Sequence, residues 1–314
     1  MTLADYANFS NNAIAAATIV MAVAFFAHMA EWGFARQIKT VDRELELVES
    51  SGAAVAGLDE DEDITTIRTN MFGRVGVALT VVGWLVLWAG VITRALASER
   101  VPWGNMYEFG TTGIGIALTI YLLLVWRIGI AWLGGIVTGF AVIVLGLSMT
   151  VYVPAGPTVP ALHSYWLVIH VISVMIAGSL FLVGAGVSAL YLVKARAEER
   201  GSVGGLLDRF PSSAAMDQLA YRVHAFAFPL WTFGALIAGP IWAQYAWGRY
   251  WGWDPKEVWA FITWVVYAGY LHARATAGWR GKRAAYIALV GFGTFLANYI
   301  IINLVVPGLH SYAK

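Results

Sequence analysis

The strongest constraint on the fold of this chain is a series of eight apolar runs of roughly 20 residues, each long enough to cross a bilayer as a helix. Hydrophobic residues make up 59% of the 314 residues and charged residues only 12%, against about 25% charged in soluble proteins. This composition argues against a water-soluble enzyme. We therefore expect an all-α, polytopic membrane protein with about eight transmembrane helices. The expected helices are 12–34, 73–97, 109–126, 129–152, 165–193, 221–246, 257–277 and 284–306.

Basic residues are divided unevenly between the two ends of these runs. Fifteen of the 20 Lys and Arg residues lie in alternate connecting segments or at the adjoining helix ends. The positive-inside rule therefore places both chain termini on the outer side, together with 98–108, 153–164 and 247–256. The first cation is Arg36, so the first run has no basic leader and is expected to be a retained helix rather than a cleaved signal.

Charge and hydrophobicity divide the chain into four parts. Residues 1–35 form the first transmembrane helix, and 36–72 form a charged inner loop that is expected to be a disordered linker. Residues 73–152 hold helices two to four, and 153–314 hold helices five to eight. The absence of cysteine excludes disulfides and thiol catalysis by this chain, and a net charge of +1 gives no sign of a nucleic-acid partner.

Tryptophans are concentrated in one predicted outer segment. Eight of the 15 lie between Trp231 and Trp279, and Trp247, Trp251 and Trp253 fall within seven residues, interleaved with two glycines. An aromatic belt at the membrane interface explains one or two rings per helix end. Three rings with glycines between them favour a platform for a large planar apolar ligand.

Asp254 directly follows the three tryptophans and has two interpretations. It could belong to the ligand platform. It could also cap a helix, with Pro255 at the first helical position and Glu257 adding negative charge to the first turn. Both interpretations stay open at the level of sequence.

Two of the six histidines are expected beside the platform. His170 lies about one and a half turns inside the outer end of the fifth helix, and His310 lies just past the outer end of the eighth. A planar apolar ligand between two imidazoles describes a heme with bis-histidine ligation. His163 lies in the same outer region, and its position leaves it as an alternative.

His272 is expected in the inner half of the seventh helix, about 22 Å from its outer end. An ionisable residue inside a span is a functional hypothesis by default, and a neutral histidine hydrogen-bonded to a neighbouring helix is the alternative. His28 and His224 also fall near inner helix ends. Either could partner His272.

Four motifs follow one another in the second half of the chain. They are Trp166-Leu-Val-Ile-His170-Val, Trp242 to Glu257 continuing into Trp259-Ala-Phe-Ile-Thr-Trp264, Tyr270-Leu-His272-Ala-Arg274, and Gly308-Leu-His310-Ser-Tyr312. Together they resemble the heme-handling membrane proteins of cytochrome c maturation, whose tryptophan-rich signature is called the WWD domain. The resemblance is strongest to the CcsA (ResC) subunits of the system II cytochrome c synthase. Asn105-Met-Tyr107-Glu108 looks like a weaker family segment upstream.

The resemblance implies residue roles by position. His170 and His310 match the two external histidines that ligate heme iron, and His272 matches the intramembrane histidine of a second heme site, whose partner is supplied by a CcsB (ResB) subunit. This chain lacks the large outer domain of that subunit, so the inner site is expected to be incomplete. Residues 153–314 would be the heme-handling core, with an external WWD segment at 242–259. The expected heme b-binding residues are His170, His310 and His272 as iron ligands, with Trp247, Trp251, Trp253 and Asp254.

The implied function is cytochrome c biogenesis: heme is carried across the membrane and presented to an apocytochrome c, whose C-x-x-C-H thiols form the thioethers. The chain would be a subunit of a holocytochrome c synthase in a cell inner or plasma membrane, or a thylakoid membrane. Its implied partners are a CcsB-type subunit, the apocytochrome, a thiol-reducing protein and membrane lipid. A heme exporter or chaperone without synthase activity and a non-heme multi-pass transporter are the alternatives.

Overall fold

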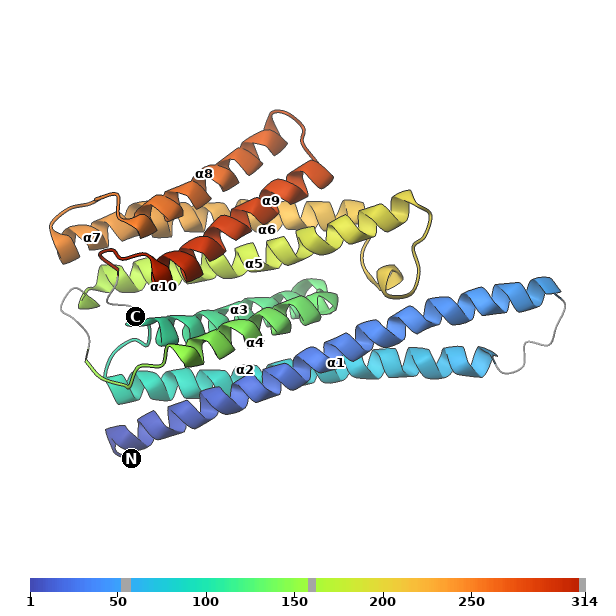
Figure 1. The fold of residues 1–314 in the computed structure, drawn as a ribbon, viewed down its shortest axis with the longest axis horizontal. Helices are drawn as coiled ribbons and strands as arrows, with labels where there is room; N and C mark the ends of the chain where they lie inside the picture. Colours follow the sequence, from blue (N-terminus) through green and yellow to red (C-terminus); the bar gives the residue numbers. More distant parts are fainter. Residues whose placement is uncertain (52–57, 158–161, 311–314) are drawn as a thin grey trace.

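The computed structural model describes residues 1–51, 58–157 and 162–310, with no description of side chains in 37–63. Every regular element in these described residues is helical, which confirms the predicted all-α class (Figure 1). The main elements are α1 (Leu3–Ser51), α2 (Leu58–Ser98), α3 (Met106–Ile128), α4 (Gly134–Thr150), α5 (Tyr165–Glu199), α6 (Ser213–Phe233), η4 (Gly234–Ala238), α7 (Gly239–Trp247), α8 (Pro255–Ala275), α9 (Lys282–Leu296), η5 (Ala297–Ile302) and α10 (Asn303–Val305). Short 3₁₀ turns, η1 (Ala131–Leu133) and η3 (Gly205–Arg209), precede α4 and α6.

Seven helical segments in the described chain have the length and apolar composition needed to cross a membrane. They coincide with seven of the eight predicted runs. The remaining run corresponds to α8, which has 21 residues and carries charged residues at both ends. The seven segments are Leu3–Arg36, Ile64–Ser98, Met106–Ile128, Ala131–Thr150, Tyr165–Glu199, Ser213–Trp247 and Lys282–Val305.

The helices run roughly along one axis, with α1 and α2 packed together on one side and α6 to α10 on the other (Figure 1). Helix α5 lies between these groups and also contacts α3 and α4. The N-terminus, the α2–α3, α4–α5 and α7–α8 connections, and the last described residues all lie at one end of the bundle. The segments predicted to be external therefore share one end, called the predicted outer end below. The side of the membrane that this end faces stays a prediction.

The expected disordered linker at 36–72 requires correction, because helix occupies most of it. Helix α1 continues to Ser51 and α2 already begins at Leu58. The sequence from 36 to 51 contains no Gly or Pro and several strong helix formers. A helix that is already nucleated in the membrane can propagate through such a sequence at low cost, since nucleation is the unfavourable step.

A buried charge cluster joins three segments at the predicted outer end. Glu108, with 0% of its side chain exposed, accepts hydrogen bonds from Arg94 Nε at 2.9 Å, from Arg100 Nη1 at 2.7 Å and from the Gly104 amide at 2.9 Å. Arg94 also donates to the Val153 carbonyl beyond α4. The cluster thus connects the end of α2, the start of α3 and the α4–α5 connection, and the next residues of α3, Phe109 and Gly110, line the pocket described below.

We expect Glu108→Ala to destabilise the protein by roughly 3–5 kcal/mol, because it leaves two arginines without their buried counter-charge. The measurement is thermal or denaturant unfolding in detergent. Glu99→Gln, at an exposed position in the same connection, is the control and should change the stability by less than about 0.5 kcal/mol. Equal stability of the two variants would contradict a structural role for the cluster.

Candidate functional site

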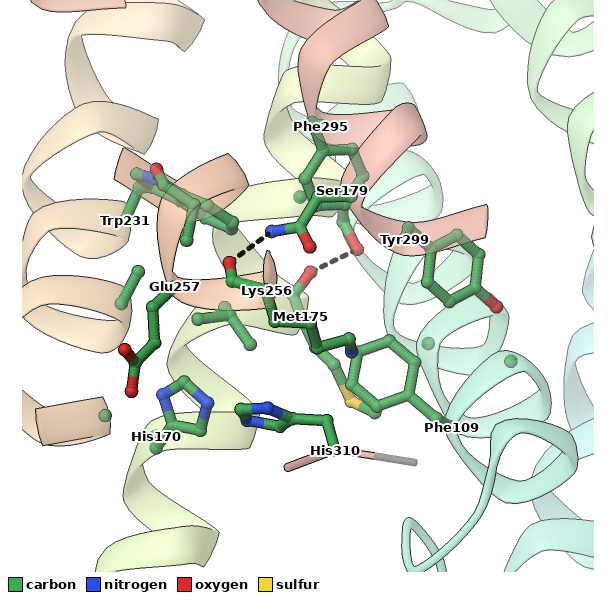
Figure 2. Close-up of a pocket in the computed structure, with 18 of the residues that line it drawn as sticks. Phe109, His170, Met175, Ser179, Trp231, Lys256, Glu257, Phe295, Tyr299 and His310 are labelled. Atoms are coloured by element: carbon green, nitrogen blue, oxygen red, sulfur yellow. Dashed lines mark hydrogen bonds between the residues drawn. The ribbon is translucent and has the colours of Figure 1, made fainter. Parts of the chain in front are cut away.

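A large pocket lies in the predicted outer half of the bundle, where α3, α4 and α5 meet α7, α8 and the α9–η5 segment (Figure 2). It encloses about 1170 Å³ of space not occupied by protein atoms, a volume that includes space open to the surroundings. Aliphatic, aromatic and glycine residues make up most of its wall. The lining residues also include His170, Trp242, Trp247, Trp251, Lys256, Glu257, Asn298, Tyr299 and His310.

His170 enters the pocket from the second turn of α5. Its Nδ1 lies 2.8 Å from the carbonyl oxygen of Gly234, so the neutral ring donates from Nδ1 and keeps its lone pair on Nε2. The ring is nearly parallel to that of Trp242, at a centroid distance of 5.9 Å and an angle of 10°. Gly239 packs closely beside it: a Cβ there would lie 3.1 Å from the imidazole, so the ring would have to shift by a few tenths of an ångström.

A π-helical turn positions the acceptor of the His170 hydrogen bond. Residues Gly234–Ala238 (η4) form this turn between α6 and α7. A second π-helical turn, Ala297–Ile302 (η5), borders the pocket from the opposite side. Such turns are frequent at functional sites because they shift the side chains and carbonyls of one helical turn.

His310 reaches the same pocket from the segment after α10. Its Nδ1 lies 2.9 Å from Asp254 Oδ2, an arrangement in which the imidazole donates to the carboxylate. The ring meets Trp247 edge to face at 4.9 Å and lies 5.7 Å from the Trp242 ring. Figure 2 shows the two imidazoles next to each other at the pocket wall.

The electrostatics around His310 favour a neutral ring beside an ionised carboxylate. Burial lowers the pKa of His310 below its usual 6.5, although the hydrogen bond to Asp254 opposes this. Burial would raise the pKa of Asp254, but hydrogen bonds from His310 and from the Leu309 amide outweigh it and lower this pKa below 3.8. At neutral pH the ring is therefore unprotonated on Nε2, the state in which an imidazole can ligate a metal.

Asp254 caps a helix, one of the two roles that the sequence left open, and it also holds His310, although Asp254 itself is not among the described residues that line the pocket. It caps α8 by accepting from the Lys256 amide at 3.3 Å, and Glu257 completes a capping box by accepting from the Asp254 amide at 3.0 Å. Its second oxygen accepts from the Leu309 amide, which comes close only because residue 308 is glycine: a Cβ there would lie 2.6 Å from Asp254 Oδ1. The helix cap and the partner of His310 are one side chain.

The predicted tryptophans divide into two groups. Trp247 and Trp251 line the pocket. Trp253 does not, since it is 67% exposed and packs edge to face against Trp251, with ring centroids 5.8 Å apart. Trp242, at 2% exposure, contacts both histidines, although the sequence-based site residues did not include it. The sequence-based site residues did not include Lys256 either. Its position in the first turn of the helix that Asp254 caps could have indicated that it lies near the site.

Comparison with known proteins places this arrangement in a family. The family described as cytochrome C assembly protein matches residues 76–310, a range that contains every residue of the pocket. The chain belongs to this family. Cytochrome c biogenesis protein CcsA of Guillardia theta is 37% identical over 261 residues, which cover 76% of this chain and 85% of that protein. The protein of the same description from Porphyra purpurea is 33% identical over 288 residues, which cover 78% and 89%.

A solved structure shows the fold of this cytochrome c assembly protein in a larger chain. Cytochrome c Heme Lyase CcmF superposes with a TM-score of 0.63 at 16% identity, over 96% of this chain and 47% of that one. The present chain therefore spans about half the length of that protein. At this identity the similarity shows the shared fold alone.

The remaining histidines of this assembly protein lie away from the pocket. His163 is exposed, and His272 is exposed on α8 in a stripe with Phe261, Val265 and Gly269. His28 is buried, with its Nδ1 3.4 Å from Glu31, and His224 is buried among aromatic rings of α5 and α8. The structure thus brings together His170 and His310 but gives His272 no histidine partner among the described residues.

Proposed function

We propose that this chain binds heme b between His170 and His310 and presents it to an apocytochrome c for thioether attachment. The observation that carries the proposal is the pair of imidazoles from distant parts of the chain, each held through Nδ1 against a tryptophan wall in an apolar pocket. The names of the family and of the CcsA relatives support a role in cytochrome c biogenesis.

The residues of the pocket fit a heme. Two neutral imidazoles supply iron ligands, and acceptors on Nδ1 fix their orientation, as is usual for metal-binding histidines. Trp242, Trp247 and Trp251 offer flat apolar surfaces to a planar ring and exclude water from it. When bound there, heme supplies the vinyl groups that accept the thiols, and the chain contributes proximity and orientation.

The thiols in this scheme belong to the substrate. The chain has no cysteine, so both sulfur atoms of the thioether bonds must come from the apocytochrome and must be kept reduced by another protein. Trp253, exposed at the predicted outer end next to Trp251, is placed where an incoming peptide would first meet the site. This exposure supports presentation at this end of the bundle, which the positive-inside rule assigns to the outer membrane face.

A CcsB-type membrane subunit is the proposed partner at the opposite half of the bundle. His272 is exposed on α8, in a stripe with Phe261 at 38% and Val265 at 47% exposure, and Gly269 adds a position with open space around it. Small residues allow a neighbouring transmembrane helix to approach closely. A helix docked on this stripe would cover His272 and could supply its second ligand.

His272→Ala should lower the heme content of the complex with a CcsB-type subunit while leaving heme bound to the isolated chain unchanged. The measurement is heme per polypeptide from pyridine hemochrome spectra of both preparations. Val265→Ala, on the same exposed stripe, is the control for a loss of docking. An unchanged heme content of the His272→Ala complex would leave this residue with no ligand role.

Co-expression tests the function as a whole. The chain is produced with and without a CcsB-type subunit, together with an apocytochrome c, and covalent heme is detected by heme staining of denaturing gels. Covalent heme on the apocytochrome only when the chain is present supports the proposal. Tightly bound heme without any covalent product would favour an exporter or chaperone, and the absence of a Soret band in the purified chain would refute heme binding.

A further inference from the structure

The pocket contains one side-chain cation whose role is not explained by iron ligation. Lys256 is the only Lys or Arg among the described residues that line it. Figure 2 shows its side chain extending from the start of α8 into the pocket, between the two histidines and the wall formed by Trp231 and Phe295. An ammonium group in such surroundings requires a counter-charge or a strong hydrogen bond.

The nearby carboxylates are used elsewhere. Asp254 accepts from His310 and from the Leu309 and Lys256 amides, and Glu257 accepts from the Gly252 and Asp254 amides. Within the described part of the chain, no carboxylate forms an ion pair with the Lys256 ammonium. The pocket therefore holds a positive charge that its own wall does not pair.

The backbone of Lys256 is held on both sides, which fixes the point from which its side chain extends. Its amide donates to Asp254 Oδ2 at 3.3 Å, and its carbonyl accepts from Asn298 Nδ2 at 3.3 Å. These bonds tie the first turn of α8 to the helix cap and to the π-helical turn η5. Asp254, which caps this helix, also accepts from His310, so the same side chain positions Lys256 and the proposed iron ligand.

We infer that Lys256 binds a carboxylate of the planar ligand and thereby selects which edge of the tetrapyrrole enters the pocket. The inference rests on the proposed function. Heme b carries two propionates on one edge and its vinyl groups on the other half of the ring. A propionate paired with Lys256 points inward, past the histidines, and directs the vinyl half toward Trp247, Trp251 and the predicted outer end, where the substrate thiols arrive. Lys256 is a positioning residue in this reaction.

The test compares heme with its dimethyl ester, in which both carboxylates are blocked, by Soret titration of the purified chain in detergent. If Lys256 forms a charge-assisted hydrogen bond with a propionate, wild type should bind heme roughly 10–100-fold more tightly than the ester. Lys256→Met should reduce this preference to about twofold, because it lowers the affinity for heme and leaves the affinity for the ester unchanged. Lys256→Arg should retain the preference. Lys282→Met, which removes a half-exposed lysine at the opposite end of the bundle, should behave as wild type.

The outcomes separate the inference from the proposed function. If neither porphyrin gives a bis-histidine spectrum with wild type, heme binding itself is refuted. Equal affinities of wild type for heme and ester, or an undiminished preference in Lys256→Met, overturn the role of Lys256 while leaving heme binding in place. If Lys256→Met binds the ester as tightly as wild type does, its pocket is intact. If Lys256→Met no longer binds the ester, Lys256→Gln replaces it in the same comparison.

Discussion

Replacing either His170 or His310 with alanine should abolish cytochrome c maturation and strongly reduce the heme bound by the purified chain. Each substitution removes one proposed iron ligand and leaves its former hydrogen-bond partner, the Gly234 carbonyl or the Asp254 carboxylate, without the imidazole N–H. The measurements are heme staining of the product cytochrome and the Soret spectrum of the purified variant.

Added imidazole distinguishes loss of a ligand from loss of fold. The alanine variants leave a cavity the size of the missing ring between the pocket and the wall of Trp242, so free imidazole should restore part of the heme content and of the maturation. His163→Ala, which removes an exposed histidine near the start of α5, is the matched control and should mature cytochrome normally. Normal maturation in both His170→Ala and His310→Ala would refute the ligand assignment.

Asp254→Asn should weaken heme binding by about 10–100-fold, the effect usual for residues that orient a metal ligand. Asparagine caps helices about as well as aspartate, so α8 keeps its N-terminal cap. The negative charge that accepts from His310 Nδ1 is lost, which makes the imidazole a weaker donor to iron and should raise the midpoint potential of the bound heme. Asp254→Ala removes the cap as well and should destabilise the protein by about a further 1 kcal/mol.

Affinity is measured by Soret titration and the potential by a redox titration of the same preparation. Asp208→Asn, at an exposed position at the far end of the bundle, serves as the control for loss of one carboxylate. Wild-type affinity and potential in Asp254→Asn would mean that this residue serves as a helix cap alone.

Much of the architecture was predictable, because a membrane-spanning helix can be recognised from the apolar composition of a local run of residues. Seven of the expected runs coincide with helices able to cross a membrane, and α8 matches the remaining one. The segment 36–72 was the exception. Its charge indicated a solvated loop, but a helix that leaves the membrane needs only good helix formers to continue to Ser51.

The main residues of the candidate site were predictable from the sequence, but the groups that position them were not. His170, His310, Trp247 and Trp251 line one pocket, as expected from residues predicted to lie on one side of the membrane. Trp253 does not line it, and Trp242 does. The Gly234 carbonyl that holds His170 depends on a π-helical turn, which no local pattern in the sequence indicated.

By itself, the sequence determined the all-α class, the approximate positions of the membrane-spanning helices and the absence of thiols in the chain, because these follow from composition and order along the chain. It also indicated the end of the bundle at which the tryptophans and two histidines gather. Only the tertiary structure decided that Asp254 both caps α8 and holds His310, that His272 faces outward, and that Lys256 enters the pocket without an ion pair to any carboxylate of the described residues. These depend on how helices distant in sequence rotate against one another, and packing in three dimensions determines that rotation.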